Sequence, residues 1–272
     1  MTAPPLTWLY APGDRPHVVA KALTAGADVV VIDLEDAVAP DRKEYARAAT
    51  AELLSAPQPV PVHVRVNALD GPLAPPDLEA VADRPGLSGL RLPKVTSPEQ
   101  IIRTAEHSAP ATALYALLES ALAVEHAHAI AAAHPALRGI ALGEADLRAD
   151  LGVREDAGLD WCRSRIVVAA RAAGLPPSPQ SVHPDIRDLE GLAASCAHGR
   201  TLGFLGRAAI HPRQLPIIER AYLPTEREVE EAETIVKAAT TQQGAQALPD
   251  GRFIDAAVVA AAHRTLSLAR RN

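Results

Sequence analysis

The sequence of 272 residues has very few cysteines, which limits its redox and metal chemistry. Cys162 and Cys196 are the only two, and they lie far apart and outside any metal-binding spacing. This usage fits a reducing compartment, with buried and unreactive thiols. We therefore assign neither thiol a chemical role.

Long apolar runs and excess positive charge are also missing. No run of eighteen apolar residues occurs, so we expect no membrane-spanning helix. The N-terminal MTAPPLTWLYAPGDRP has proline and charge where a signal peptide needs an apolar core, which favours a cytoplasmic protein. The net charge is -6 and no basic stripe is clustered, so nucleic acid is not an expected partner.

Several catalytic motifs are absent as well. There is no G-x-x-x-x-G-K-[ST] loop, no G-x-G-x-x-G after a strand and no G-x-S-x-G elbow, so covalent nucleophilic catalysis has no evident candidate. His126 and His128 are two residues apart, which points them in different directions on a helix and makes zinc the less favoured metal. A Schiff base at Lys94 is possible by position, but an ion-paired lysine is the simpler interpretation.

The sequence does contain an alternation of short apolar runs with longer alanine-rich amphipathic stretches. Hydrophobic residues make up 48% of the chain, enough for a large buried core. The alternation predicts repeated βα units around a parallel sheet, and eight strands predict a closed (β/α)8 TIM barrel, the α/β class. The predicted strands are Thr7–Tyr10, Val29–Asp33, Val60–Val66, Gly89–Leu92, Ala113–Leu118, Gly139–Leu142, Pro179–Val182 and Ala208–Ile210.

Helices are predicted between the strands, and a helical extension follows them. The residues 1–220 are expected to form the barrel, and 221–272 a C-terminal extension that a closed barrel does not need. It could pack on its own barrel or reach that of a neighbouring subunit. The predicted helices include Arg15–Ala25, Lys43–Leu54, Pro98–Ser108, Ala121–Ala132, Asp160–Ala173, Thr225–Thr240 and Ile254–Arg270.

Charged residues follow most of the predicted strands. The active site of a parallel barrel lies at the carboxyl ends of its strands, so these residues are the candidates for chemistry. For any single acidic residue a helix-capping role is the simpler interpretation, and it fits Asp33 and Asp36 best. The charged residues at these ends are Asp14, Arg15, Asp33, Glu35, Asp36, Arg65, Lys94, Glu119, Glu144, Asp146 and His211.

Glu119 and Asp146 form the candidate metal pair. They end neighbouring strands, and two carboxylates with open positions suit Mg²⁺, which takes its other ligands from water and substrate. Carboxylates converging on one site repel one another and require cations among them. Arg65 and Lys94 supply part of that compensation.

Eight segments of the chain resemble the citrate lyase β-subunit-like family of the HpcH/HpaI aldolase and malate synthase-like superfamily. They occur in the order of that family and cover nearly the whole chain. The segments are Tyr10-Ala-Pro-Gly-Asp-Arg-Pro, Asp33-Leu-Glu-Asp-Ala-Val-Ala-Pro, Val64-Arg-Val-Asn, Leu92-Pro-Lys, Leu118-Glu-Ser-Ala, Leu142-Gly-Glu-Ala-Asp-Leu, Gly203-Phe-Leu-Gly-Arg-Ala-Ala-Ile-His-Pro-Arg-Gln and Asp250-Gly-Arg-Phe-Ile-Asp.

The resemblance implies a (β/α)8 barrel with Mg²⁺, acyl-CoA thioester substrates and a homotrimer. It implies metal ligation by Glu119 and Asp146, and contact of Arg65 with the 2-oxo acid fragment. It marks Asp255 as the general acid/base, which in relatives comes from an adjacent subunit. Asp36, Lys94 and Arg15 complete the expected substrate-binding residues.

The chain departs from the family pattern at three places. Relatives usually read Gly-Ala-Glu-Asp-Leu where this chain has Gly143-Glu-Ala-Asp-Leu, so Glu144 is displaced by one position. Arg207 stands where relatives often have lysine, which changes the expected local fit to CoA or substrate. Ala256-Ala257 replaces a segment in which relatives often carry proline.

These observations favour an Mg²⁺-dependent carbon–carbon lyase that cleaves or forms a 3-hydroxyacyl-CoA from acetyl-CoA and a 2-oxo acid. Two alternatives remain: a metal-dependent aldolase acting on free 2-oxo acids, and a subunit that acts on an acyl-carrier thioester only within a larger complex. A binding barrel without catalysis is disfavoured by the intact Glu119, Asp146, Arg65 and Asp255. The sequence does not choose among citryl-, citramalyl-, malyl- and hydroxymethylglutaryl-type thioesters.

Overall fold

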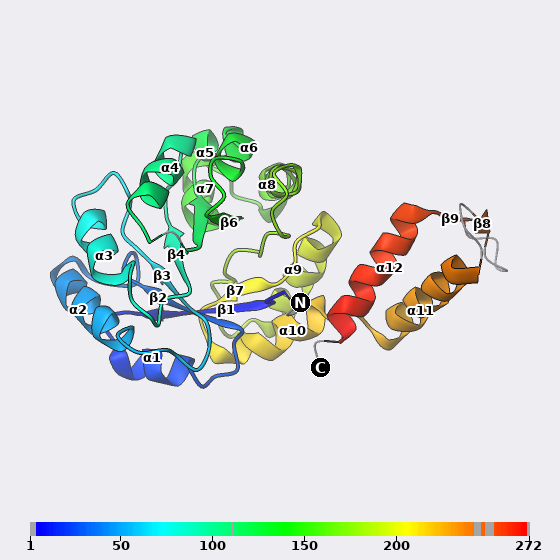
Figure 1. Cartoon of the computed structure of the whole chain (residues 1–272), viewed down its shortest axis with the longest axis horizontal. Coiled ribbons are helices and arrows are strands. Elements are labelled where there is room, and N and C mark those ends of the chain that lie inside the picture. The colour runs from blue at the N-terminus through cyan, green and yellow to red at the C-terminus, as the bar shows by residue number, and fades with distance from the viewer. Residues whose placement is uncertain (1–3, 110, 242–245, 248–252, 271–272) are drawn as a thin grey trace. The chain divides into compact units, whose positions relative to one another are not determined.

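The computed structural model describes all residues except 1–3, 110, 242–245, 248–252 and 271–272 (Figure 1). It consists of two compact units. The first runs from Leu6 to Ala221. The second contains Tyr222 and the described residues after it, together with Pro4 and Pro5.

The first unit contains a parallel sheet of seven strands in the order β6-β5-β4-β3-β2-β1-β7. Strands β2 and β4 are buried at every position, as expected where both faces of a parallel sheet are covered. The strands are β1 (Thr7–Pro12), β2 (Val29–Asp33), β3 (Val62–Arg65), β4 (Gly89–Leu92), β5 (Leu114–Leu118), β6 (Leu137–Leu142) and β7 (Arg207–Ala209).

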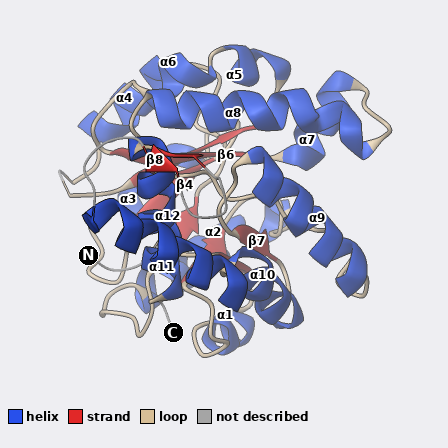
Figure 2. Ribbon diagram, turned by 90° about the vertical axis from the view of Figure 1, so that its right-hand side faces the viewer, coloured by secondary structure: helices blue, strands red, loops and turns tan. Residues whose placement is uncertain are grey.

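Helices connect the strands and flank the sheet, which gives a TIM-barrel-like α/β fold (Figure 2). The predicted helix at Ala121–Ala132 is divided at His126 into two short helices. The helices are α1 (Pro16–Ala22), α2 (Lys43–Leu53), α3 (Ala74–Val81), α4 (Pro98–Glu106), α5 (Ala121–Glu125), α6 (Ala127–Ala131), α7 (Glu144–Leu151), α8 (Asp160–Ala172), α9 (Leu189–Leu202) and α10 (Leu215–Tyr222).

The prediction of a closed eight-stranded (β/α)8 barrel is wrong in one element. The segment Pro179–Val182 forms no strand. It makes a single parallel bridge, from Gln180 to Arg207, the first residue of β7. Towards β6 the described residues form no ladder, and the Glu144 N–H donates to Ser181 Oγ at 3.3 Å. The physical reason is proline: Pro179 has no N–H to donate to a ladder, and two further prolines precede it.

The strand register places large side chains at matched levels. Asp33, Arg65, Arg91 and Tyr115 are partners across β2 to β5, so they share one level of the sheet. The register follows from the period-two alternation of the strands, because a slip of one residue would exchange the two faces.

His63 on β3 is buried, and its ring stacks on that of Tyr115 with the ring centroids 4.4 Å apart. Burial, and secondly the charge of Arg91, holds the pKa of His63 well below its ordinary value. The unfolded chain therefore binds a proton that the folded chain does not, so stability is complete above the ordinary histidine pKa and declines as the pH falls below it.

We expect the unfolding free energy to fall by up to about 1.4 kcal/mol per pH unit below about pH 6.5 because of this one group. Denaturant unfolding of wild type and His63→Phe between pH 7.5 and 5 measures it, and the variant should have the flatter profile. His17→Phe, at an exposed histidine, is the matched control. An equally steep profile in His63→Phe would refute the assignment.

The second unit contains two helices, α11 (Glu226–Thr241) and α12 (Ala256–Ala269), that pack against each other. Between them β8 (Gln246–Ala247) pairs antiparallel with β9 (Phe253–Ile254). Asp255 begins α12, and its carboxylate accepts the N–H of Val258 at 2.9 Å. No helix in the described part of either unit has both the length and the apolar character to span a bilayer.

Candidate active site

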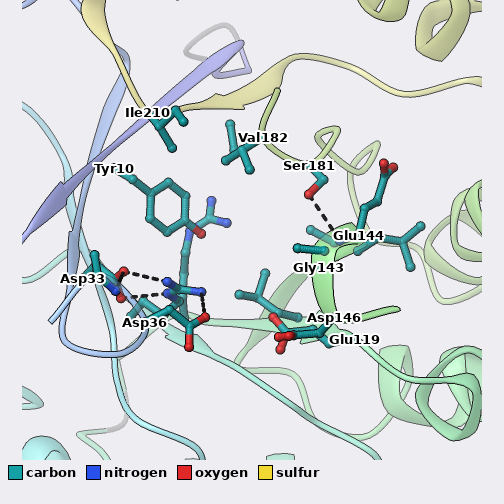
Figure 3. Close-up of a pocket in the computed structure, with 18 of the residues that line it drawn as sticks. Tyr10, Asp33, Asp36, Glu119, Gly143, Glu144, Asp146, Ser181, Val182 and Ile210 are labelled. Atoms are coloured by element: carbon teal, nitrogen blue, oxygen red, sulfur yellow. Dashed lines mark hydrogen bonds and ion pairs between the residues drawn. The ribbon is translucent and has the colours of Figure 1, made fainter. Parts of the chain in front are cut away.

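Charged side chains gather at the carboxyl ends of strands β2 to β6, around a cavity of about 420 Å³ (Figure 3). This is the edge at which the sequence predicted the site. The residues that line the cavity include Tyr10, Asp33, Arg65, Arg91, Glu119 and Asp146.

Arg65 ends β3 and is held by carboxylates from the end of β2 and from the loop that follows it. Its Nε and Nη2 donate to the two oxygens of Asp33 at 2.8 and 2.6 Å, and Nη1 donates to Asp36 at 3.3 Å (Figure 3). Nη1 also lies 3.0 Å from Glu35 Oε2. Burial acts to lower the pKa of Arg65, but the bonds and charge of Asp33 outweigh it and raise that pKa. Arg65 is thus a fixed cation with only part of its guanidinium free for a ligand.

Asp33 and Asp36 have different roles, although a capping role was predicted for both. Asp33 accepts the backbone N–H groups of Glu35 at 2.9 Å and Ala37 at 3.1 Å, so it does cap the turn that follows β2. The side chain of Asp36 is 60% exposed and instead contacts Arg65 and Lys94. Asp33 therefore orients the loop, and Asp36 belongs to the charged surface of the site.

Lys94 follows β4 and is ion-paired, as the simpler interpretation predicted. Its Nζ lies 2.5 Å from Glu35 Oε1, 3.4 Å from Asp146 Oδ2 and 3.7 Å from Glu119 Oε2. Burial lowers the pKa of Lys94, but the hydrogen bond and charge of Glu35 outweigh it, so that the pKa is raised. An ammonium group with a raised pKa stays protonated, which disfavours a Schiff-base role.

Glu119 is a buried carboxylate with an unsatisfied oxygen. It follows β5, its side chain is 4% exposed, and its Oε2 has no hydrogen-bond partner among the described residues. Burial first, and then the negative charge of Glu35, raises the pKa of Glu119 to about 8, against the opposing charges of Lys94 and Arg65. Such a group is stabilised by any cation placed against it.

Asp146 comes close to Glu119 from the first turn of α7. Both carboxylates lie within 4 Å of the same Lys94 Nζ, so they converge on one point. The described residues contain no group of three His, Cys, Asp or Glu suited to a metal. Two carboxylates with open positions match Mg²⁺, which keeps water and substrate as its other ligands. The donor set and the unsatisfied Glu119 oxygen therefore fit magnesium.

Gly143, at the end of β6, provides the space that the Glu119 carboxylate occupies. A Cβ at this position would lie under 3.0 Å from the Cγ, Cδ and Oε1 atoms of Glu119. Real Cβ atoms do not approach so closely, so a larger residue would displace the carboxylate. The glycine is therefore part of what positions the candidate ligand.

Glu144, whose role was in doubt from the sequence, is paired with a buried arginine on α8. Arg163 Nε and Nη2 donate to its two oxygens at 2.9 and 2.7 Å. Arg163 Nη1 also donates to Asp156 at 2.8 Å and Asp160 at 3.0 Å. The hydrogen bond from Arg163 lowers the pKa of Asp156 to about 2. Glu144 thus connects the start of α7, which carries Asp146, to α8.

Arg163→Met is expected to destabilise the protein by about 3–5 kcal/mol, since it leaves the largely buried Glu144 carboxylate without its partner. Thermal or denaturant unfolding measures this. Arg165→Met, at a more exposed arginine on the same helix, is the control and should change stability by less than about 1 kcal/mol. A loss in Arg163→Met no larger than in the control would contradict the assignment.

Two other predicted residues of the first unit, Arg15 and Arg207, do not join this group, and a third, Asp255, is in the second unit. Arg15 stands at the start of α1, exposed and 3.9 Å from Asp14. Arg207 is buried on β7 and donates to Ser195 at 2.9 Å, so it packs against α9 and does not line the cavity. Asp255 belongs to the second compact unit, where it caps α12.

Sequence reasoning missed several residues of the site. Glu35 was noted at a strand end without a role, yet it contacts both Arg65 and Lys94. Lys43 holds the same loop, because its Nζ donates to the backbone oxygen of Glu35 at 2.6 Å. Tyr10 and Arg91 line the cavity from within the strands. The available signal for those two was strand alternation, which separates the two faces but does not say which face lines a cavity.

The chain is similar in sequence to proteins of one known family. Residues 6–212 match the family described as HpcH/HpaI aldolase/citrate lyase. The chain is 33% identical to the citrate lyase subunit beta of Leuconostoc mesenteroides subsp. cremoris, over 98% of this chain and 93% of that protein. It is 35% identical to the (3S)-malyl-CoA thioesterase of Cereibacter sphaeroides, over 96% of this chain and 93% of that protein.

The chain is also similar in structure to a solved protein related to citrate lyase. The crystal structure of protein CitE from Mycobacterium tuberculosis, in complex with magnesium, acetoacetate and coenzyme A, superposes with a TM-score of 0.83 at 35% identity. The match covers 98% of each chain.

Proposed function

Because the chain belongs to the HpcH/HpaI aldolase/citrate lyase family, we propose that it is a magnesium-dependent carbon–carbon lyase acting on CoA thioesters. Its substrate is a 3-hydroxyacyl-CoA, which it cleaves to acetyl-CoA and a 2-oxo acid or forms in reverse. The observation that carries the proposal is the buried Glu119 oxygen, unsatisfied within the described residues, beside the Asp146 carboxylate at the cavity.

Glu119 and Asp146 are the proposed ligands of magnesium, which when bound supplies a Lewis acid that makes the substrate hydroxyl more acidic. Arg65 stabilises the negative charge that the substrate hydroxyl oxygen carries once its proton has left, and, in the condensation direction, the charge that returns to the carbonyl oxygen of the 2-oxo acid. Its guanidinium is already oriented by Asp33, so little reorganisation is needed during the reaction. Lys94 and Asp36 border the same space and are the proposed contacts for the rest of the substrate.

The bond that breaks joins the hydroxyl-bearing carbon to the α-carbon of the thioester. Its electron pair goes to the α-carbon, the hydroxyl oxygen becomes the carbonyl of the 2-oxo acid, and the hydroxyl proton is released. Asp255 gives a proton to the α-carbon and takes one from it in the condensation direction. Arg15, an exposed cation that follows β1, is proposed to contact the anionic CoA portion.

The residues 1–220 are proposed as the catalytic domain and 221–272 as an extension that completes the site of a neighbouring subunit in a homotrimer. In this arrangement Asp255 acts on the substrate bound in the neighbouring subunit and not on the substrate of its own subunit. A cytoplasmic location is part of the proposal, and it is supported by two buried free cysteines, Cys162 and Cys196.

The test incubates the purified chain with citryl-, citramalyl-, malyl- and hydroxymethylglutaryl-type CoA thioesters, with Mg²⁺ or with chelator, and identifies the products by mass spectrometry. The expected result, with Mg²⁺ only, is acetyl-CoA plus a 2-oxo acid from a citryl, citramalyl or malyl thioester; the hydroxymethylglutaryl thioester would give acetyl-CoA plus a 3-oxo acid. Free CoA plus the hydroxy acid would instead indicate thioester hydrolysis, the activity named for the Cereibacter relative. Activity on 2-oxo acids plus aldehydes without CoA would favour the aldolase, and activity only with an acyl-carrier partner would favour the complex subunit.

A further inference from the structure

Arg91 on β4 is a buried arginine without an acidic partner. It is 3% exposed, it lines the cavity, and its Nε has no hydrogen-bond partner among the described residues. No carboxylate in the described part of the chain lies within 4 Å of its guanidinium. Arg65, by contrast, has the carboxylates of Asp33, Glu35 and Asp36 within that distance. A buried charge without a partner is costly, so this position calls for an explanation.

The two other buried arginines in the described part of the chain have polar side-chain partners, although Arg207 Nε, like Arg91 Nε, has none. Arg163 is bound by the carboxylates of Glu144, Asp156 and Asp160. Arg207 does not line the cavity, and its Nη1 donates to the Ser195 hydroxyl. Arg91 therefore differs from both in facing the cavity with hydrogen-bonding capacity unused.

Aromatic rings surround Arg91 but do not replace an anion. Its Cζ lies 5.8 Å from the ring centroids of Trp8 and Tyr10 and 5.7 Å from that of Tyr115. These distances are near the outer limit of a cation–π interaction, about 6 Å, and the rings accept no strong hydrogen bond. They hold the guanidinium in place and leave its N–H groups for a ligand.

The position of Arg91 relates it to the proposed reaction centre. The Tyr10 ring is shared, since its centroid is 5.4 Å from the Cζ of Arg65 and 5.8 Å from that of Arg91. Arg91 pairs in register with Arg65 and with Tyr115, and Tyr115 lies within β5 whereas Glu119 follows it, so Arg91 is attached nearer the amino ends of the strands than Glu119 is. One cavity thus has the candidate metal ligands at the strand ends and an unpaired cation deeper in the sheet.

We propose that Arg91 binds a second carboxylate of the substrate, so that the 2-oxo acid released or consumed is a dicarboxylic one. This inference rests on the proposed lyase function and adds the substrate class. A guanidinium matches a carboxylate with two parallel hydrogen bonds, and at a buried position such as that of Arg91 this pairing discriminates strongly against a ligand that lacks the group. Arg91 is therefore a specificity-determining residue.

The test measures the binding of oxaloacetate and of pyruvate, which differ by this one carboxylate, to the full chain with Mg²⁺ by calorimetry. Arg91→Met should weaken oxaloacetate binding by about 10- to 100-fold and change pyruvate binding less than about twofold. Arg91→Lys, which keeps the charge but not the planar fork, should lie between. Arg103→Met, at an arginine exposed on α4, is the control and should change neither affinity.

Pyruvate binding also reports whether the variants are folded. Equal losses for both acids in Arg91→Met and Arg91→Lys, no loss for either, or tighter wild-type binding of pyruvate than of oxaloacetate would each overturn the inference. These outcomes are separate from failure of the proposed function, which would be a wild-type chain that cleaves no CoA thioester with Mg²⁺.

Discussion

Replacing Glu119 with glutamine is expected to abolish magnesium binding and to lower the lyase rate by about 10²–10³-fold. The variant loses one of only two proposed anionic ligands, and a neutral amide is a poor replacement for Mg²⁺. The fold should persist, because burial already raises the pKa of Glu119 to about 8 and glutamine resembles the neutral acid. Magnesium calorimetry and steady-state cleavage of the thioester measure the two effects.

The melting temperature gives an independent readout of the same variant. Mg²⁺ should raise it in the wild type, because a ligand that binds only the folded state stabilises that state, and should not raise it in Glu119→Gln. Without metal, the variant should be at least as stable as the wild type above neutral pH, because a carboxyl with a raised pKa costs stability where it is ionised. Glu125→Gln, at an exposed glutamate on α5, is the matched control. Retained Mg²⁺ binding in Glu119→Gln would contradict the metal assignment.

Asp255→Asn is expected to be nearly inactive while folded, with a loss of about 10²–10⁴-fold for a proton-transfer group. Asparagine caps a helix about as well as aspartate, so α12 should still begin at Ala256. If the proposed trimer places Asp255 in a neighbour's site, mixing two inactive variants should restore activity. Glu119→Gln subunits would supply Asp255, and Asp255→Asn subunits would supply the metal ligands.

Random reassembly of these two variants in equal amounts should give about a quarter of wild-type activity, because a site needs one subunit of each kind. Each variant reassembled alone is the control and should stay inactive. Light scattering checks that the mixture contains trimers. Trimers that stay inactive after mixing would show that Asp255 does not act in a neighbouring site.

The sequence predicts most of the sheet because its strands are short apolar runs bounded by glycine, proline or charge. Val29–Asp33 and Gly89–Leu92 agree with β2 and β4 to the residue. The exception is Pro179–Val182, where the position in the βα order favoured a strand and the prolines prevented its ladder. Order along the chain thus predicts where a strand belongs, whereas hydrogen-bonding capacity decides whether it forms.

The convergence of charged side chains was predictable where strand ends alone determine it. Arg65, Lys94, Glu119 and Asp146 do converge at one edge of the sheet, since parallel strands bring their carboxyl ends together. The pairing of Glu144 with Arg163 could not be predicted, because it depends on how α7 and α8 pack. The role of Arg91 could not be predicted either, because strand alternation does not say which face of the sheet lines the cavity.

The most direct test of this account is a crystal structure of the chain with Mn²⁺ in place of Mg²⁺, in which anomalous scattering locates the ion. We expect one ion bound by carboxylate oxygens of both Glu119 and Asp146, with metal–oxygen distances of about 2.0–2.3 Å. An ion bound elsewhere, or one that touches neither carboxylate, would contradict it.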